Sequence, residues 1–357
     1  MKIKRISFSA KNNLFYDTLK QKVENYFASN KLKPTGNWKL YSKTIILLIS
    51  AIAIYLSLLI FPLYFWIALP LCALLGLNLA GIGFNVMHDG AHGSYAKAEW
   101  LNEMMAYSLN AMGGSSYLWK VKHNFNHHSF TNIEGMDDDI DIKPWMRTNE
   151  NQKRYWFHRY QHIYWVLFYS LTYLFWIFFA DFKKYFSNKV SDMKFRKMNV
   201  KEHFIFWVSK IVYFSIAIAV PAFVIGFWQT ILGFLVLSAV CGLTLGIVFQ
   251  MAHIVEHTNF DLADESNKKI EKEWAVHQIN TTANFATKSK IISWFTGGLN
   301  FQVEHHLFPR ISHVHYPAIS KFVKETCEQF KVKYIEYPTF LSALYSHILY
   351  LKAVGVK

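Results

Sequence analysis

The chain has 357 residues, of which 52% are hydrophobic and 18% aromatic, yet its formal net charge is +14. The apolar residues form long blocks separated by basic, polar stretches, which is typical of an integral membrane protein and argues against a purely soluble domain. No recognised nucleic-acid motif accompanies the charge. Two of the three cysteines (Cys72, Cys241 and Cys327) lie in apolar runs and are expected to be buried thiols, and the odd number suggests no disulfide framework.

The N-terminal part of the chain predicts an arm followed by a helical hairpin. Residues 1–43 are polar and amphipathic and lack the early apolar run of a cleavable signal peptide. We therefore expect a cytoplasmic arm and a first membrane helix that also acts as the insertion signal. The apolar block from Ile45 to Met87 exceeds the ~20 residues of one crossing. With a turn at Pro62, it predicts helices near 44–61 and 64–87.

A second apolar block, from Phe204 to Met251, predicts another hairpin. Pro221 and the sequence GFWQ divide it into helices near 205–224 and 229–251. Between the two blocks lies a weaker apolar segment, Tyr164 to Ala180. Whether this segment crosses the membrane decides the topology.

Basic loops on both sides of the weaker segment favour an interfacial or re-entrant helix. The loop before it carries Lys120, Lys122, Lys143, Arg147, Lys153 and Arg154, and the loop after it carries Lys183, Lys184, Lys189, Lys194, Arg196, Lys197 and Lys201. Both loops are cytoplasmic by the positive-inside rule, so the aromatic-rich segment between them would lie at the headgroup level. An ordinary fifth span is the alternative.

The predicted fold is therefore an all-α integral membrane protein with four transmembrane helices in two hairpins. We expect the interfacial helix and a cytoplasmic helical cap to complete it, and residues 318–357 to form a cytoplasmic C-terminal helical tail.

Histidine motifs follow the predicted hairpins and indicate a metal site. They are HDGAH (88–92), HNFNHH (123–128), HIVEH (253–257) and QVEHH (302–306). Residues four apart on a helix share a face, so two imidazoles can bind one ion. An even number of crossings places all four motifs on one side of the membrane. The candidate ligands are His88, His92, His123, His127, His128, His253, His257, Gln302, His305 and His306.

Two of these motifs leave the ligand choice open. In the third, we favour His257 as a ligand and allow His253 as a ligand or as a partner of one. Gln302 is expected to bind weakly through its amide oxygen or a water, or only to pack the motif. Other histidines have no predicted metal role: His277, His313 and His315, and the surface or interfacial His158, His162, His203 and His347.

The number of histidines exceeds what one zinc ion takes, so two metal ions fit better. Imidazole alone admits Zn, Cu, Fe or Ni. At the mouth of a membrane domain the obvious substrate is a lipid chain, and cleaving an unactivated C–H bond there favours non-haem iron, which activates oxygen. Acidic neighbours are candidates for orienting the imidazoles, for capping helices or for solvated loops: Asp89, Asp137, Asp138, Asp139, Asp141, Glu256 and Glu304.

The motifs HDGAH, HNFNHH and QVEHH resemble the three histidine boxes of the membrane fatty acid desaturases, and the glutamine in the last is similar to the front-end branch. The resemblance extends to Pro317 and includes RYQHIYW (159–165) and WAVHQINTTANF (274–285). It implies a desaturase domain over residues 44–317 with a di-iron centre of two non-haem Fe ions and O₂ as co-substrate. The implied reaction inserts a cis double bond of the Δ5 or Δ6 type into an acyl-CoA or acyl-lipid.

One departure from many front-end desaturases concerns the electron donor. The chain has no His-Pro-Gly-Gly motif of a fused cytochrome domain, so the resemblance implies electrons from an external ferredoxin or cytochrome, and the basic charge suits an acidic donor protein. Lack of fusion is more similar to bacterial members, which favours a bacterial inner membrane over the endoplasmic reticulum, with the site on the cytoplasmic face. The alternatives are a lipid hydroxylase or alkane-type monooxygenase, a sphingoid-base desaturase, and a non-enzymatic membrane metal-binding protein or transporter.

Overall fold

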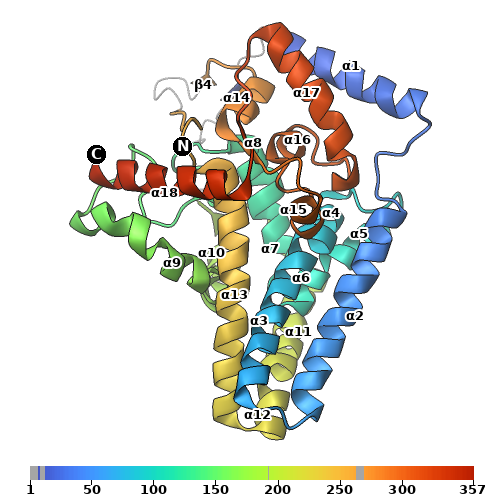
Figure 1. Cartoon of the computed structure of the whole chain (residues 1–357), viewed down its shortest axis with the longest axis vertical. Helices are drawn as coiled ribbons and strands as arrows, with labels where there is room; N and C mark the ends of the chain where they lie inside the picture. Colours follow the sequence, from blue (N-terminus) through green and yellow to red (C-terminus); the bar gives the residue numbers. More distant parts are fainter. Residues whose placement is uncertain (1–6, 9–12, 192, 263–268) are drawn as a thin grey trace.

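The computed structural model describes residues 7–8, 13–191, 193–262 and 269–357, and these residues are mostly helical, as predicted. Figure 1 shows long apolar helices running along the long axis of the molecule, with shorter helices gathered at one end. The long helices are α2 (Trp38–Ile60), α3 (Phe65–Ile82) and α13 (Phe227–His253), together with a continuous stretch made of α11 (Val200–Phe214), η5 (Ser215–Ala219) and α12 (Val220–Ile225).

Local sequence sets the ends of the two hairpins. Asn37 caps α2, because its side chain accepts a hydrogen bond from the backbone N–H of Lys39. The first hairpin turns in the four residues between α2 and α3, which include Pro62. The second turns at Gly226, whose φ of +101° is a conformation that favours glycine. Both turns lie close to the predicted positions.

Five apolar helical stretches in the described residues are long enough to cross a bilayer, one more than the four spans predicted. They are Trp38–Ile60, Phe65–His92, Trp156–Ser187, Val200–Ile225 and Phe227–His253. The additional stretch contains the segment predicted to be interfacial. It consists of η3 (Trp156–Tyr160), α9 (Gln161–Phe175), η4 (Trp176–Ala180) and α10 (Asp181–Ser187). In Figure 1 this stretch runs obliquely past α13, unlike the other four.

Glycines allow α13 to pack closely against its neighbours. A Cβ added at Gly76 of α3 would lie 2.4 Å from the carbonyl oxygen of Leu237, and one added at Gly242 would lie 2.7 Å from that of Ser170 in α9. Small residues of this kind are typical of contacts between membrane helices. The central helix α13 thus contacts both α3 and α9 over much of its length.

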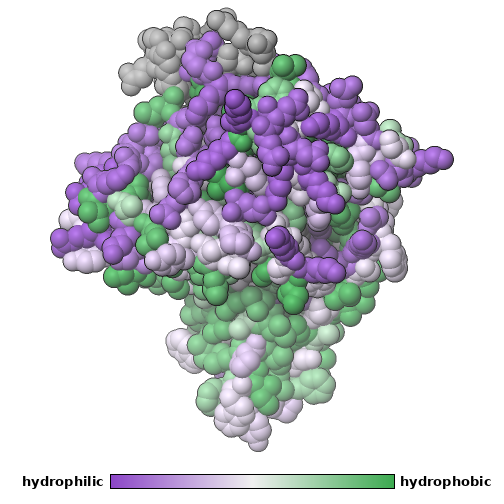
Figure 2. All heavy atoms as spheres, turned by 45° about the horizontal axis from the view of Figure 1, so that its top comes forward, coloured by the Kyte–Doolittle hydropathy of each residue, from purple (hydrophilic) through white to green (hydrophobic). Residues whose placement is uncertain are grey.

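Short helices and two-stranded pairs build the broad end of the molecule. Figure 2 shows hydrophilic side chains covering this end and hydrophobic side chains gathering on the tapered end. The helical elements are α1 (Leu14–Ser29), η1 (Gly83–Met87), α4 (His88–His92), α5 (Glu99–Ala106), α6 (Ser108–Ala111), α7 (Ser116–Lys120), η2 (Val121–His127), α8 (His128–Phe130), α14 (Trp274–Thr281), α15 (Lys290–Phe295), α16 (Gln302–Leu307), η6 (His313–His315), α17 (Tyr316–Phe330) and α18 (Phe340–Val356).

The strands are only two residues long and tie distant segments together. Parallel pairs join β1 (Ser7–Phe8) to β4 (Lys269–Ile270) and β5 (Asn284–Phe285) to β6 (Glu336–Tyr337), and an antiparallel pair joins β2 (Lys189–Val190) to β3 (Met193–Lys194).

Two histidines predicted to lie at the surface or interface are buried, which corrects that prediction. His158 is 1% exposed and His347 is fully buried, because α18 packs across η3 and α9. His162 is half-buried and His203 exposed. All three cysteines are free and buried, including the one for which burial was not predicted.

Candidate metal centre

π-helical turns position two of the four histidine motifs. The turn η1 comes directly before α4, which carries His88 and His92, and η2 contains His123 and His127. π turns, which have i→i+5 hydrogen bonds, are rare in proteins, but those that occur are often found at functional sites. In η2 it brings residues four and five apart to the same side, so His123, His127 and His128 all face the interior.

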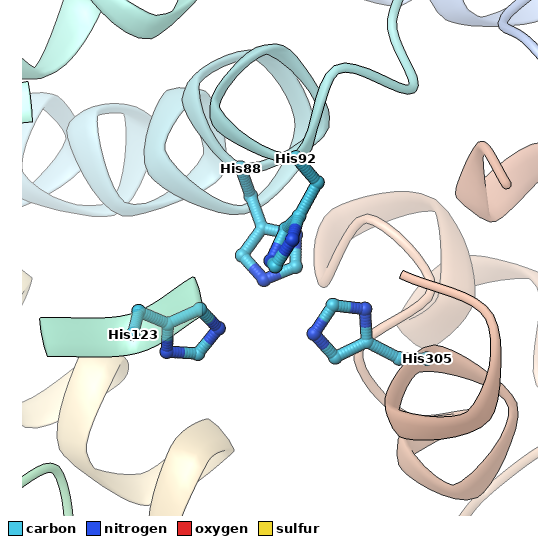
Figure 3. Close-up of side chains that lie close together, drawn as sticks. All are labelled: His88, His92, His123 and His305. Carbon is cyan, nitrogen blue, oxygen red and sulfur yellow. The ribbon is translucent and has the colours of Figure 1, made fainter. Parts of the chain in front are cut away.

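The first group of imidazoles comes from three distant parts of the chain. It comprises His88, His92, His123 and His305, all buried, and one ring nitrogen of each lies within 4.8 Å of those of the others. Figure 3 shows the four rings pointing toward one another from α4, η2 and α16. Such a set can supply the nitrogen ligands of one metal ion.

The second group lies beside the first and contains His127, His253 and His306. The amide nitrogen of Gln302 is 3.0 Å from Nε2 of His253 and 3.3 Å from Nε2 of His306. Rotation of this amide by 180° about its last bond would place its oxygen at the same point. Gln302 is therefore positioned to contribute either a hydrogen bond or an oxygen ligand to the second group.

His128 joins the two groups. Its Nε2 lies 3.3 Å from Nε2 of His123 in the first group, and its ring stacks on that of His306 in the second at 4.4 Å between centroids. The two groups thus form one continuous cluster of eight imidazoles, with room for His128 to serve either ion.

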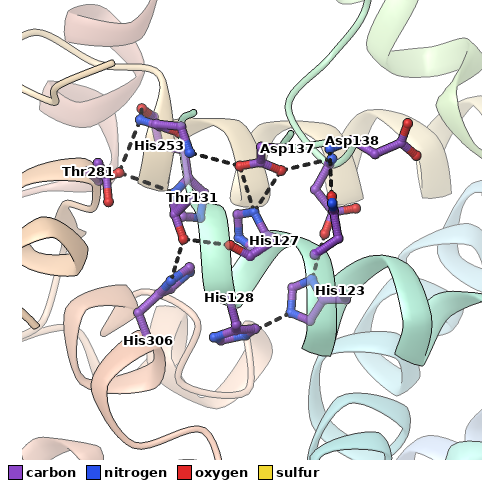
Figure 4. Close-up of polar contacts among 12 residues, drawn as sticks. His123, His127, His128, Thr131, Asp137, Asp138, His253, Thr281 and His306 are labelled. Carbon is purple, nitrogen blue, oxygen red and sulfur yellow. Dashed lines mark hydrogen bonds and ion pairs between the residues drawn. The ribbon is translucent and has the colours of Figure 1, made fainter. Parts of the chain in front are cut away.

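Most of the rings are oriented by an acceptor at Nδ1, as expected for metal-binding histidines. Figure 4 shows part of this network. Nδ1 of His123 lies 2.7 Å from a carboxylate oxygen of Asp139, and Nδ1 of His127 lies 2.9 Å from one of Asp137. Nδ1 of His306 lies 2.8 Å from the amide oxygen of Gln278. Nδ1 of His305 lies 3.1 Å from the hydroxyl of Tyr316, and Nδ1 of His253 lies 3.3 Å from the carbonyl oxygen of Thr281.

The nitrogens that face the centre of the cluster fit a metal. The Nε2 atoms of His92, His127 and His305 are buried and have no hydrogen-bond partner. A buried polar atom left without a partner costs on the order of 1–3 kcal/mol, which a coordinated ion would remove. The donor set, mostly imidazole with an amide, suits a transition metal.

Burial favours the neutral, metal-binding form of several rings in the cluster, whereas for His127 the carboxylate of Asp137 outweighs burial and raises the pKa. Burial lowers the pKa of His123 to about 4 and holds that of His305 well below its ordinary value. Burial would raise the pKa of Asp139, but the ammonium of Lys122 and the His123 ring hold it well below its usual range. Asp139 is thus an anion beside a neutral imidazole, so its carboxylate can accept the hydrogen bond from Nδ1.

The structure does not bring every candidate ligand to the cluster. His257 is exposed, has a positive φ of 79° and belongs to neither group. The helix α13 ends at His253, so the helical spacing that placed His257 on the same face is absent. His253, which we ranked below His257, lies in the second group.

The acidic candidates also divide. Asp137 and Asp139 orient imidazoles, whereas Asp138 pairs with Lys184, Asp141 pairs with Lys143 and Glu256 is exposed. The remaining two are buried and contact groups outside the cluster. Asp89 lies beside His313 and Ser312, and Glu304, whose pKa burial raises to about 7, accepts hydrogen bonds from Asn284 and Tyr334.

Several residues that support the cluster have no signal in the sequence. Gln278 and Tyr316 reach His306 and His305 only through tertiary packing. The indole of Trp119 stacks on His123 at 4.3 Å between centroids. Its position four residues before His123, about one helical turn, is the one clue that spacing could have given.

Comparison with known proteins gives consistent matches. The family model described as fatty acid desaturase matches residues 64–338. The chain is similar to an acyl-lipid (8-3)-desaturase from Physcomitrium patens, with 37% identity over 97% of this chain and 73% of the relative. It is also similar to sn-1 linoleoyl-lipid 6-desaturases from Arthrospira platensis (34% identity, 96% of this chain and 93% of the relative) and from Synechocystis sp. (34% identity, 98% of each).

Proposed function

Because the chain belongs to the fatty acid desaturase family and acts as a fatty acyl desaturase, we propose that its substrates are acyl chains esterified to membrane lipids. The new cis double bond would lie near the carboxyl end, of the Δ5 or Δ6 type. The names of the similar proteins, two of them linoleoyl-lipid 6-desaturases, support the acyl-lipid substrate and the position.

The observation that carries this proposal is the meeting of two imidazole groups from four separate motifs. We assign one iron ion to His88, His92, His123 and His305 and a second to His127, His253 and His306, with Gln302 beside the second and His128 between them. His257 is left outside both. The unpartnered nitrogens and the lowered pKa of His123 support this assignment.

A bound pair of iron ions would supply the redox chemistry that activates O₂ and removes hydrogen from an unactivated methylene. The side chains of the protein do the rest. Asp139 and Asp137 lie at Nδ1 of His123 and His127 and orient both rings with Nε2 toward the cluster. The histidines of the cluster are buried, so bulk water has little access to them.

An apolar cavity supplies a place for the acyl tail. A cavity of about 980 Å³ lies between the two hairpins and extends from Ile60 and Val224, near the turns, to Ile82 and Met112. Ile82 is six residues before His88, so the inner end of the cavity approaches the first imidazole group. Its walls are almost entirely apolar side chains, which suits a hydrocarbon chain.

We further propose a membrane topology with four crossings, in which the stretch from η3 to α10 lies along the cytoplasmic interface. Its oblique course past α13 supports this topology. His92 and His253 follow different hairpins and yet meet in one cluster, which requires an even number of crossings between them. Residues 1–43 would form a cytoplasmic arm, residues 44–317 the membrane desaturase domain with its cap, and residues 318–357 a cytoplasmic tail.

The electron donor is proposed to be a separate acidic ferredoxin or cytochrome that docks from the cytoplasm. The formal net charge of the chain is +14, which favours an acidic partner. A basic surface would steer an acidic partner. A bacterial inner membrane is the proposed location, in keeping with the cyanobacterial relatives.

Expression in a host that lacks front-end desaturases tests the function. Cells fed defined mono- and diunsaturated fatty acids should accumulate lipids with one additional double bond, located by mass spectrometry on the carboxyl side of the existing one. His305→Ala is the matched inactive control, because it removes one ligand of the first group. Accumulation of a hydroxylated chain and no new alkene would contradict the proposal.

A further inference from the structure

A lysine is buried near the start of the first long apolar helix. Lys43 in α2 is 5% exposed, and its ammonium lies 2.7 Å from the amide oxygen of Asn85 and 3.1 Å from Nε2 of His313. It also lies over the ring of Trp294, 5.6 Å from the centroid. A buried ammonium is costly unless its donors are satisfied, so these contacts define a specific polar site.

The imidazole of His313 connects this ammonium to a buried carboxylate. Its Nδ1 lies 3.0 Å from Oδ2 of Asp89, which also accepts a hydrogen bond from the Ser312 hydroxyl at 2.6 Å. Lysine only donates and an ionised carboxylate only accepts. His313 therefore lies between the two opposite charges, with the ammonium of Lys43 near one ring nitrogen and the carboxylate of Asp89 near the other.

Asp89 lies between two members of the first imidazole group. His88 and His92 are the first and last residues of α4, which forms the C-terminal end of the continuous helical stretch Phe65–His92. The last turn of a helix lacks intrahelical partners for its carbonyl groups, so contacts with other segments help to fix its position. The second imidazole group takes none of its members from α4.

We propose that Lys43, His313 and Asp89 form a positioning chain that fixes α4 against α2 and η6, so that His88 and His92 hold the first metal. The inference rests on the proposed di-metal centre and adds a selectivity to it. The positioning chain affects the binding of the first ion and not that of the second. None of the three residues contacts the metal-facing nitrogens directly.

Metal content of the purified full-length protein tests this selectivity without relying on activity. Wild type should hold about two iron ions per chain. Asp89→Asn, His313→Leu and Lys43→Met should weaken affinity for one ion by about 10- to 100-fold, as changes to ligand-orienting groups do, and leave about one ion bound. His313→Gln, whose amide keeps a donor and an acceptor, should retain more metal than His313→Leu.

Two controls separate positioning from simple loss of stability. Lys210→Met removes another buried lysine, 2.9 Å from the carboxylate of Asp181 and outside both groups. It should lower the unfolding temperature and leave two ions bound. Asp137→Asn acts on His127 in the second group, so its combination with Asp89→Asn should lose both ions.

The inference is overturned if Lys43→Met behaves like Lys210→Met, with lower stability and both ions retained, or if Asp89→Asn and Asp137→Asn together remove only one ion. A wild-type protein that binds no iron would instead contradict the proposed function itself. If the wild type and the variants all bound two ions, the positioning chain would be rejected and the proposed function would stand.

Discussion

His123 and Asp139, sixteen residues apart in the chain, are held with 2.7 Å between Nδ1 of the ring and a carboxylate oxygen. The carboxylate is itself paired with the ammonium of Lys122, one residue before the histidine. This arrangement fixes the tautomer of the ring and leaves Nε2 free to face the cluster. A residue of the acidic run after the second histidine motif thus orients a histidine of that motif.

Replacing that carboxylate should weaken metal binding with little change in fold. Asp139→Asn is expected to lower iron affinity at the first group by about 10- to 100-fold, because an amide accepts the Nδ1–H hydrogen bond less strongly and adds no charge. Asp138→Asn is the matched control, since its carboxylate pairs with Lys184 and contacts no imidazole of the cluster. Iron per chain, measured at several free iron concentrations, distinguishes the two. Equal affinities in both variants would contradict the role of Asp139.

The two histidines of the third motif should differ sharply on substitution. His253→Ala removes a buried member of the second group and is expected to abolish desaturation and to cost one iron ion per chain. His257→Ala alters an exposed side chain and should leave both quantities unchanged. Product analysis and iron content of the two purified variants check this. If His257→Ala lost iron and His253→Ala did not, His257 would be the ligand, as the sequence spacing suggested.

The contrast between these two histidines shows where the sequence stops being informative. Spacing places His88 and His92 on one face because their helix continues through both, but α13 ends at His253 and the same spacing fails for His257. Long apolar helices and their turns are fixed by local composition, so both hairpins could be predicted. Partners such as Gln278 depend on how distant segments pack, which no local pattern encodes.

Stability should depend on pH through His347. Burial lowers its pKa to about 4, from an ordinary value of 6.5. Between pH 6.5 and 4 the unfolded chain therefore binds a proton that the folded chain does not, and stability falls as the pH is lowered, by about 1.4 kcal/mol per pH unit for this group. Below about pH 4 the group contributes no further change.

The variant His347→Gln isolates this contribution. Its amide does not titrate and still offers a donor for the carbonyl of Ile254 and an acceptor for the hydroxyl of Tyr169, the two present partners of the ring. Unfolding temperatures recorded from pH 4 to 7 should decline less steeply for the variant than for the wild type. Parallel curves would show that the ring titrates normally in the folded protein.

Close packing of the two hairpins should be sensitive to a single methyl group. A Cβ at Gly76 would lie 2.4 Å from the carbonyl oxygen of Leu237 and 3.2 Å from the backbone nitrogen of Cys241, so Gly76→Ala must push α3 away from α13. Overpacking of this kind typically costs about 1–3 kcal/mol. Because α3 leads to His88 and α13 ends at His253, the same displacement should also separate the two imidazole groups and lower activity.

Gly83→Ala provides the comparison, since the nearest atom to its added Cβ is a Leu245 methyl carbon at 3.7 Å, an ordinary contact. Chemical unfolding in detergent micelles should show a clear loss of stability for Gly76→Ala and little change for Gly83→Ala. If both variants unfolded like the wild type, α3 and α13 would not approach as closely as their backbones do here. The hairpins would then need another means of bringing the histidines together.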